Sequence, residues 1–190
     1  MTRTSTAAGR TLFLDPWTGV SGDMLLGALL AVGEGDPHLI NVLRETVGSL
    51  GLPADLVTVD RVTERGVGAT RVTVAFEQCP PMRHLADMVR MVEGAGLSGW
   101  VADRSLAALR QLAQVEADVH GCTPEEIHFH EVGAADTLVD VVGTFTLLAA
   151  LGVDEVVVGP IQVGGGTVEI AHGRMGVPAP ATARLLQGYP

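Results

Sequence analysis

Residues 127–158 read IHFHEVGAADTLVDVVGTFTLLAALGVDEVVV, and the pattern of side chains changes twice along them. Apolar and polar residues alternate at Ile127–His130, apolar residues recur at three- and four-residue steps through Ala134–Leu151, and β-branched residues dominate Glu155–Val158. These patterns predict a strand, a long helix and a second strand. A helix between two strands is typical of an α/β fold, which is the class we expect.

The remaining segments extend this alternation. The expected strands are Leu12–Asp15 and an antiparallel pair, Leu56–Val62 and Thr70–Glu77; the expected helices are Asp23–Val32, Pro37–Leu50, His84–Gly94, Gly99–His120 and a last helix from Pro180 to Gly188. This order predicts a mixed β-sheet with helices packed against it, and an α+β arrangement stays open. Residues 1–11 are expected to be a flexible tail. Residues 12–190 are expected to form a single α/β domain.

Composition excludes several classes of function. All twelve basic residues are arginine, which removes Schiff-base chemistry and the lysine of a phosphate-binding P-loop. A formal net charge of −10 without an arginine cluster argues against nucleic acid or an anionic membrane as a partner. The longest apolar stretch, Val141–Val153, is interrupted by glycine and threonine and is too short to span a bilayer.

Cysteine usage and the first residues indicate the compartment. Cys79 and Cys122 are far apart and form no CxxC pair, so nothing suggests a secreted disulfide framework. Met1–Thr11 lacks the apolar core of a signal peptide. We therefore expect a soluble cytoplasmic protein, and a homo-oligomer stays open.

Histidines and carboxylates concentrate between Glu116 and Asp140. This run contains three of the six histidines and seven carboxylates. Imidazole nitrogen combined with carboxylate oxygen suits zinc, nickel, manganese or iron better than calcium. The run is the strongest candidate metal site in the sequence.

Glu116 and His120 stand four residues apart on the apolar stripe of the expected helix Gly99–His120. A buried glutamate needs a partner, which a metal, a histidine or an arginine would supply. The alternative is an ordinary hydrogen-bonded i,i+4 pair, which the local spacing favours when the two residues are taken alone.

Further candidate ligands lie in and just after the first strand of the opening stretch. His128 and His130 point to one side because side chains alternate along a strand, and Glu131 follows them. Asp136 and Asp140 are four residues apart in the next helix. Asp136 could simply complement the helix dipole, whereas Asp140 is too far along the helix for that role.

Two other segments carry candidate site residues. In LDPWTGVSGDM, Asp15 ends a strand, while Ser21 and Asp23 stand at a helix N-terminus whose free amides can hold an anion. A capped turn is the alternative. In GGGTVEIAHGRMG, His172 stands at a turn as an extra ligand or base, or as a solvated turn residue.

Four motifs carry a family resemblance. LDPWTGVSGDMLLGALL, VEADVHG, HFHEVGAADTLVDVVG and AHGRMGVPAPAT resemble, in order and spacing, the nickel insertion proteins that complete the nickel-pincer cofactor of lactate racemase. The resemblance spans residues 12–188 and is loose over residues 33–99. One departure is Met175-Gly176, where that family usually has Leu-Pro before VPAPAT.

The resemblance implies a CTP-dependent nickel chelatase, or cyclometallase, of the lyase class. Such an enzyme places nickel into a pyridinium mononucleotide that carries two thiocarboxylates, and forms sulfur-nickel and carbon-nickel bonds. The present chain looks like the amino-terminal part of a longer protein. CTP and its divalent ion are implied to bind the carboxyl-terminal part, which this chain is expected to need for full activity.

The chemistry expected from the residues agrees with this resemblance. A nickel donor must bind the ion yet release it to a sulfur-rich acceptor, and histidine with carboxylate suits both steps. A carbon-nickel bond also requires a base for the ring proton. The candidate metal-binding residues are His120, His128, His130, Glu131, Glu116, Asp136 and Asp140; the candidate catalytic residues are His128, His130, Glu131 and His172; the candidate residues for positioning the acceptor are Asp15, Ser21 and Asp23.

Two other classes of function stay open. In a metal-dependent hydrolase the same cluster would activate water, and the metal-loaded protein would turn over simple phosphoesters. A non-catalytic nickel carrier or assembly module would bind metal without any reaction, even with the carboxyl-terminal part supplied.

Overall fold

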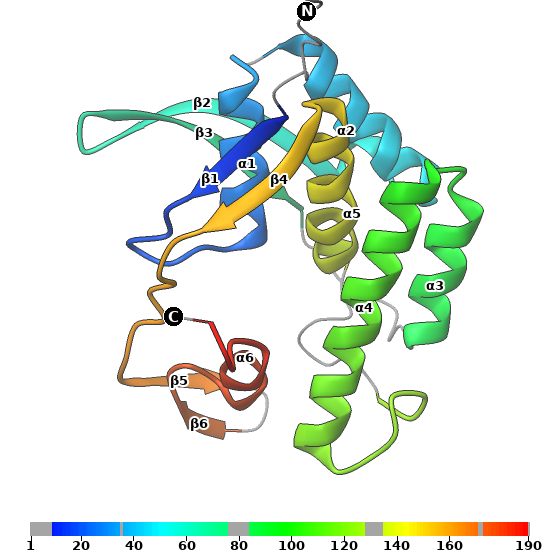
Figure 1. Ribbon diagram of the computed structural model, residues 1–190, viewed down its shortest axis with the longest axis vertical. Coiled ribbons are helices and arrows are strands. Elements are labelled where there is room, and N and C mark those ends of the chain that lie inside the picture. The colour runs from blue at the N-terminus through cyan, green and yellow to red at the C-terminus, as the bar shows by residue number, and fades with distance from the viewer. Residues whose placement is uncertain (1–8, 35, 76–83, 128–134, 171–172, 190) are drawn as a thin grey trace, which may run out of the picture.

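The computed structural model describes residues 9–34, 36–75, 84–127, 135–170 and 173–189, and it confirms the α/β class (Figure 1). Helices and strands follow one another in the expected order from the first strand to Val158. The predicted strand Ile127–His130 is the exception, because only Ile127 lies in the described part of the chain. Ile127 is buried, and the strand stays a prediction.

Two strands far apart in the sequence form a parallel pair. β1 (Arg10–Leu14) lies beside β4 (Val153–Val158), with Phe13 opposite Val157. α5 (Ala135–Ala150) leads directly into β4, so the helix and strand predicted from the opening stretch both form. Figure 1 shows α5 alongside this pair and α1 behind it.

The other strands form two hairpins. β2 (Val57–Glu64) and β3 (Val67–Val74) make the expected antiparallel pair, joined by Arg65 and Gly66, which both have a positive φ. Two such residues are what a tight hairpin turn requires. β5 (Thr167–Ile170) and β6 (Gly173–Gly176) form a second hairpin that we did not predict.

The described strands are divided among three two-stranded sheets, one parallel and two antiparallel. The sequence pattern led us to expect one mixed sheet. Alternation within a strand indicates which side is buried, but it does not reveal whether the neighbour is a strand or a helix. Here α1 packs directly on β3.

The helices begin and end close to the predicted residues. They are α1 (Gly22–Val32), α2 (Pro37–Ser49), α3 (Leu85–Gly94), α4 (Gly99–His120), α5 and α6 (Pro180–Leu185), with a short 3-10 helix at Ala54–Leu56. Local signals explain several ends. The Asp36 carboxylate accepts a hydrogen bond from the His38 amide at 2.9 Å, and Gly121 ends α4 with φ +70°.

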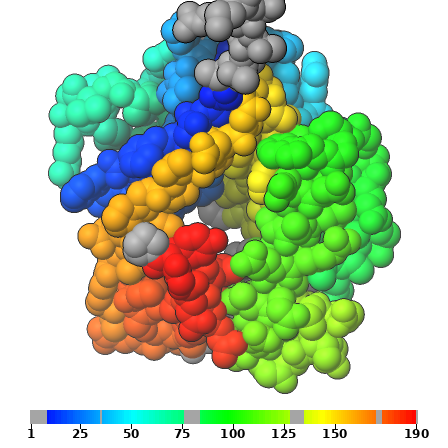
Figure 2. Space-filling view, viewed as in Figure 1, coloured from blue at the N-terminus to red at the C-terminus, as the bar shows by residue number. Residues whose placement is uncertain are grey.

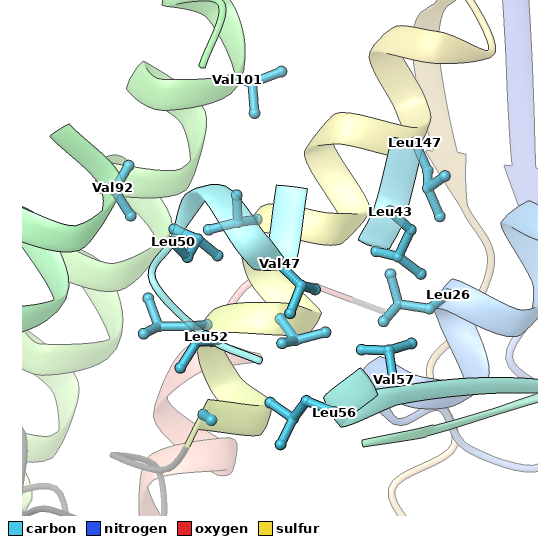
Figure 3. Packing of buried hydrophobic residues seen from close by; sticks show 14 of the residues in the cluster. Leu26, Leu43, Val47, Leu50, Leu52, Leu56, Val57, Val92, Val101 and Leu147 are labelled. Atoms are coloured by element: carbon cyan, nitrogen blue, oxygen red, sulfur yellow. The ribbon is translucent and has the colours of Figure 1, made fainter. Parts of the chain in front are cut away.

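The core lies between α1, α2 and α5 and continues to α3 and α4 (Figure 3). Leu26, Leu43 and Leu147 are fully buried there. Gly143 allows the close packing, because a Cβ at this position would lie 2.7 Å from Leu43 Cδ1. No helix in the described ranges has both the length and the apolar content to cross a membrane.

Candidate functional site

Side chains from three elements line one cavity, which we call the acid cavity. Its volume is about 390 Å³, and its lining residues are Ser21, Gly22 and Asp23 of the α1 start, Arg71, Val72, Thr73 and Val74 of β3, and Asp136 and Asp140 of α5. The sequence placed Ser21 and Asp23 in one candidate group and the two α5 aspartates in another. The structure brings these four residues together.

Gly22 explains how Asp140 reaches this cavity. A Cβ built on Gly22 would lie 2.1 Å from the Asp140 carboxyl carbon. Only glycine leaves room for the carboxyl group between the α1 start and α5. The glycine is therefore required for this packing.

Burial and like charge act together on Asp140. The pKa of this carboxyl is raised from 3.8 to about 7, first by burial, then by the neighbouring charges of Asp136 and Asp23. Its Oδ1 atom is buried and has no hydrogen-bond partner among the described residues. Near neutral pH this group can therefore accept or release a proton, or accept a cation that neutralises it.

The other two carboxylates are held by local contacts. The Ser21 hydroxyl donates a hydrogen bond to the Asp23 carboxylate, and it makes no capping hydrogen bond with the helix backbone although Ser21 occupies the N-cap position. Asp136 lies in the first turn of α5 and accepts a hydrogen bond from the Thr137 amide at 2.6 Å. Asp136 thus stands in the first helical turn, where a carboxylate complements the helix dipole. Its side chain also lines the acid cavity.

Arg71 is a cavity residue that the sequence reasoning missed. Its guanidinium pairs with Glu64 on the neighbouring strand. Three carboxylates face this one arginine in the lining, so the cavity favours cations over anions. The hairpin pattern predicted the strand, but no sequence signal showed that it would pack against α1.

Glu116 and His120 lie close together on α4, four residues apart as the sequence predicts. His120 Nε2 lies 3.7 Å from Glu116 Oε2, and both side chains are partly buried. Neither residue lines the acid cavity. The structure therefore does not join this pair to Asp136 and Asp140 through that cavity.

Asp15 also lies outside the acid cavity. It lines a separate apolar groove with the residues that follow β1. The groove and the acid cavity are formed by successive segments of the chain, because Ser21 follows Val20 of the groove.

Four candidates, His128, His130, Glu131 and His172, lie outside the described residues, and their roles stay predictions. Within the described ranges, no group of three or more histidine, cysteine, aspartate or glutamate side chains could hold a metal ion. The described carboxylates alone therefore do not form such a group.

Comparison with known proteins gives one consistent result. A family model described as "Nickel insertion protein" matches residues 12–190. A "Putative nickel insertion protein" of Synechococcus elongatus is 46% identical over 92% of this chain, and one of Geotalea daltonii is 42% identical over 95%. A "Pyridinium-3,5-bisthiocarboxylic acid mononucleotide nickel insertion protein" of Desulfitobacterium hafniense is 39% identical over 95% of the chain.

The matched part is less than half of each of these relatives: 43% of the Synechococcus protein, 46% of the Geotalea protein and 44% of the Desulfitobacterium protein. No solved structure matches the chain.

Proposed function

Because the chain belongs to the nickel insertion protein family, we propose that it takes part in inserting nickel into a pyridinium bisthiocarboxylate mononucleotide. In this proposal the chain is the amino-terminal histidine and carboxylate module of a longer nickel chelatase. The Desulfitobacterium relative carries that substrate in its name. Nickel is the ion to be transferred, so the module must hold it reversibly.

The observation that carries the proposal is the acid cavity. Asp23, Asp136 and Asp140 converge there from two helices, and Arg71 is the basic residue in the lining. Glu131 precedes Asp136 by only five residues in the sequence and is a further candidate ligand in this proposal. Carboxylates combined with His128 and His130 would bind nickel without the tight hold of a cysteine cage.

The reaction also needs a proton acceptor. When a ring carbon of the substrate exchanges its hydrogen for nickel, one proton must leave, while the two thiocarboxylates provide the sulfur ligands. A carboxylate with a pKa of about 7, such as Asp140, can accept that proton near neutral pH. The candidate histidines His128, His130 and His172 are the other bases in our proposal.

CTP is expected only for the full-length family, bound outside this chain. The acid cavity does not suit a triphosphate, because three carboxylates line it and Arg71 already pairs with Glu64. The lyase class, the need for the carboxyl-terminal part and a cytoplasmic location belong to the same proposal.

Calorimetric titration of nickel and zinc tests the ligand assignment. We expect the wild-type chain to bind nickel stoichiometrically and a His128→Ala/His130→Ala variant to lose that binding. His38→Ala is the matched control, since this histidine is exposed on α2 and should leave binding unchanged.

Unchanged nickel binding in the double variant would contradict the assignment. Turnover of simple phosphoesters by the metal-loaded protein would favour the hydrolase alternative. Nickel binding without insertion, with the rest of the protein supplied, would favour the carrier.

A further inference from the structure

The apolar groove beside the acid cavity is open to solvent. It has a volume of about 310 Å³ and is lined by Leu14 and the turn after β1, by Met24, Leu25 and Ala28 of α1, and by Val158 and Ile161. Among the lining residues, Trp17 is 77% exposed, and Val20 and Met24 are about half exposed. Monomeric proteins rarely leave contiguous apolar residues of this kind uncovered.

Trp17 marks the centre of this surface. Its indole borders the groove and also a second hollow of about 150 Å³, formed with Pro160, Ile161 and Gln162. An exposed tryptophan between two hollows is the kind of anchor that dominates binding energy in protein interfaces. Packing against the described residues leaves most of this side chain exposed.

The adjoining strands also lack a cover. β1 and β4 carry apolar residues on both of their sides, as strands of parallel sheets do when both sheet faces are covered. Yet Phe13 and Val157, which are opposite each other in the pair, remain 62% and 40% exposed. In Figure 2, no described segment covers β1 and β4 on the face turned to the viewer.

The relatives indicate what could cover this region. This chain corresponds to 43–46% of their length, so more than half of each relative lies outside the matched part. A second copy of the chain is a weaker candidate, because two chains with a net charge of −10 repel each other.

We propose that the apolar groove, centred on Trp17 and Val20, is the docking site for the remaining part of the full-length protein. This inference rests on the proposed function, which makes that part carboxyl-terminal. It also explains why the groove lies beside the acid cavity. Val20 and Met24 line the groove, whereas Ser21, Gly22 and Asp23 between them line the acid cavity.

A partner seated in the groove therefore lies within about one helical turn, roughly 5 Å, of the acid cavity. It completes the wall of that cavity and brings its own bound groups to the carboxylates. Docking requires no nickel, so it can be tested independently of metal insertion.

The test mixes this chain with the remaining part of the Desulfitobacterium relative, prepared as a separate folded polypeptide, in metal-free buffer. Analytical ultracentrifugation is expected to show a one-to-one complex. Trp17→Ala and Val20→Asp should each weaken it by at least about tenfold. Val67→Asp is the matched control, since Val67 is 69% exposed beside the β2–β3 turn, and it should bind as wild type does.

Three results would overturn the proposal: no complex with the folded partner, equal binding by all variants, or self-association of this chain that Val20→Asp abolishes. Should the partner fold only when coexpressed, its recovery with wild type and Val67→Asp but not with Val20→Asp supports docking. Equal recovery with all three chains overturns it. If docking holds while nickel binding fails, the proposed function is at fault and the interface stands.

Discussion

Asp140 is the residue on which the acid cavity depends most. Burial and like charge raise the pKa of its carboxyl to about 7, and Gly22 makes the space that it occupies. In the metal-free protein, ionisation of this carboxyl destabilises the folded state, because burial and two neighbouring aspartates oppose the charge. The same features make it responsive to a cation.

The raised pKa predicts how stability depends on pH. The folded protein holds the Asp140 proton up to about pH 7, whereas the unfolded chain releases it near pH 3.8. The folded state thus binds more protons than the unfolded chain in this interval. Asp140 therefore lowers the free energy of unfolding as the pH rises from about 4 to 7, and it has no further effect above pH 7. The full shift corresponds to about 4 kcal/mol. Partial exposure of the carboxyl reduces our expectation to about 1–2 kcal/mol.

Urea unfolding in the presence of a chelator measures this effect. Asp140→Asn should be more stable than wild type at pH 8 by about 1–2 kcal/mol and should equal it near pH 4. Asp103→Asn, which changes an exposed aspartate on α4, should follow the wild-type curve. A parallel pH dependence in wild type and Asp140→Asn would show that this carboxyl is not the titrating group.

The sequence singled out four residues that line the acid cavity, but it did not predict that they lie together. Ser21, Asp23, Asp136 and Asp140 were all candidates, yet in two separate sets. What joins them is a contact between Gly22 and Asp140, which are more than a hundred residues apart. No periodicity within one segment reports such a contact.

α1 is the element that connects the acid cavity with the apolar groove. Gly22 and Asp23 at its start line the acid cavity, and the next residues line the groove. The helix also packs on β3, which supplies Arg71 to the cavity. At Gly27 the α1 helix lies close against the backbone of β3. A Cβ there would lie 2.4 Å from the Thr70 carbonyl oxygen.

Gly27→Ala should therefore separate α1 from the β2–β3 hairpin. Replacing a helical glycine by alanine normally stabilises a helix by about 0.5–1 kcal/mol. Here the backbone carbonyl cannot rotate away, and we expect a net loss of about 1–3 kcal/mol in the free energy of unfolding. Gly48→Ala in α2, where nothing lies within 4 Å, should be neutral or stabilising. Equal stabilities of the two variants in urea would contradict this packing.

Most elements could be predicted because their local signals are strong. The long apolar pattern of α5 and the ends of α4 at Ser98 and Gly121 are examples. The hairpin of β5 and β6 was missed, because each strand has only four residues and β6 begins and ends with glycine, which has little strand preference. Which elements would pair into one sheet could not be predicted either, since that depends on long-range packing.

For the whole molecule, family membership gives the acid cavity its context. The chain matches the nickel insertion family over residues 12–190 and spans less than half of the relatives compared. In our account the acid cavity holds carboxylates for nickel, and the groove beside it receives the remaining part of the protein. Both surfaces are lined in part by the segment that links β1 to α1.

In our proposal, nickel binds at the acid cavity. Calorimetric titration of the Asp140→Asn variant with nickel at pH 7.5 is the sharpest test of this site. We predict that the nickel affinity falls by about 10- to 100-fold, because a ligand or a group that supports a ligand is lost. Asp103→Asn, matched in chemistry but remote from the cavity lining, should bind nickel as wild type does. An Asp140→Asn protein that folds normally and binds nickel with wild-type affinity would contradict the account.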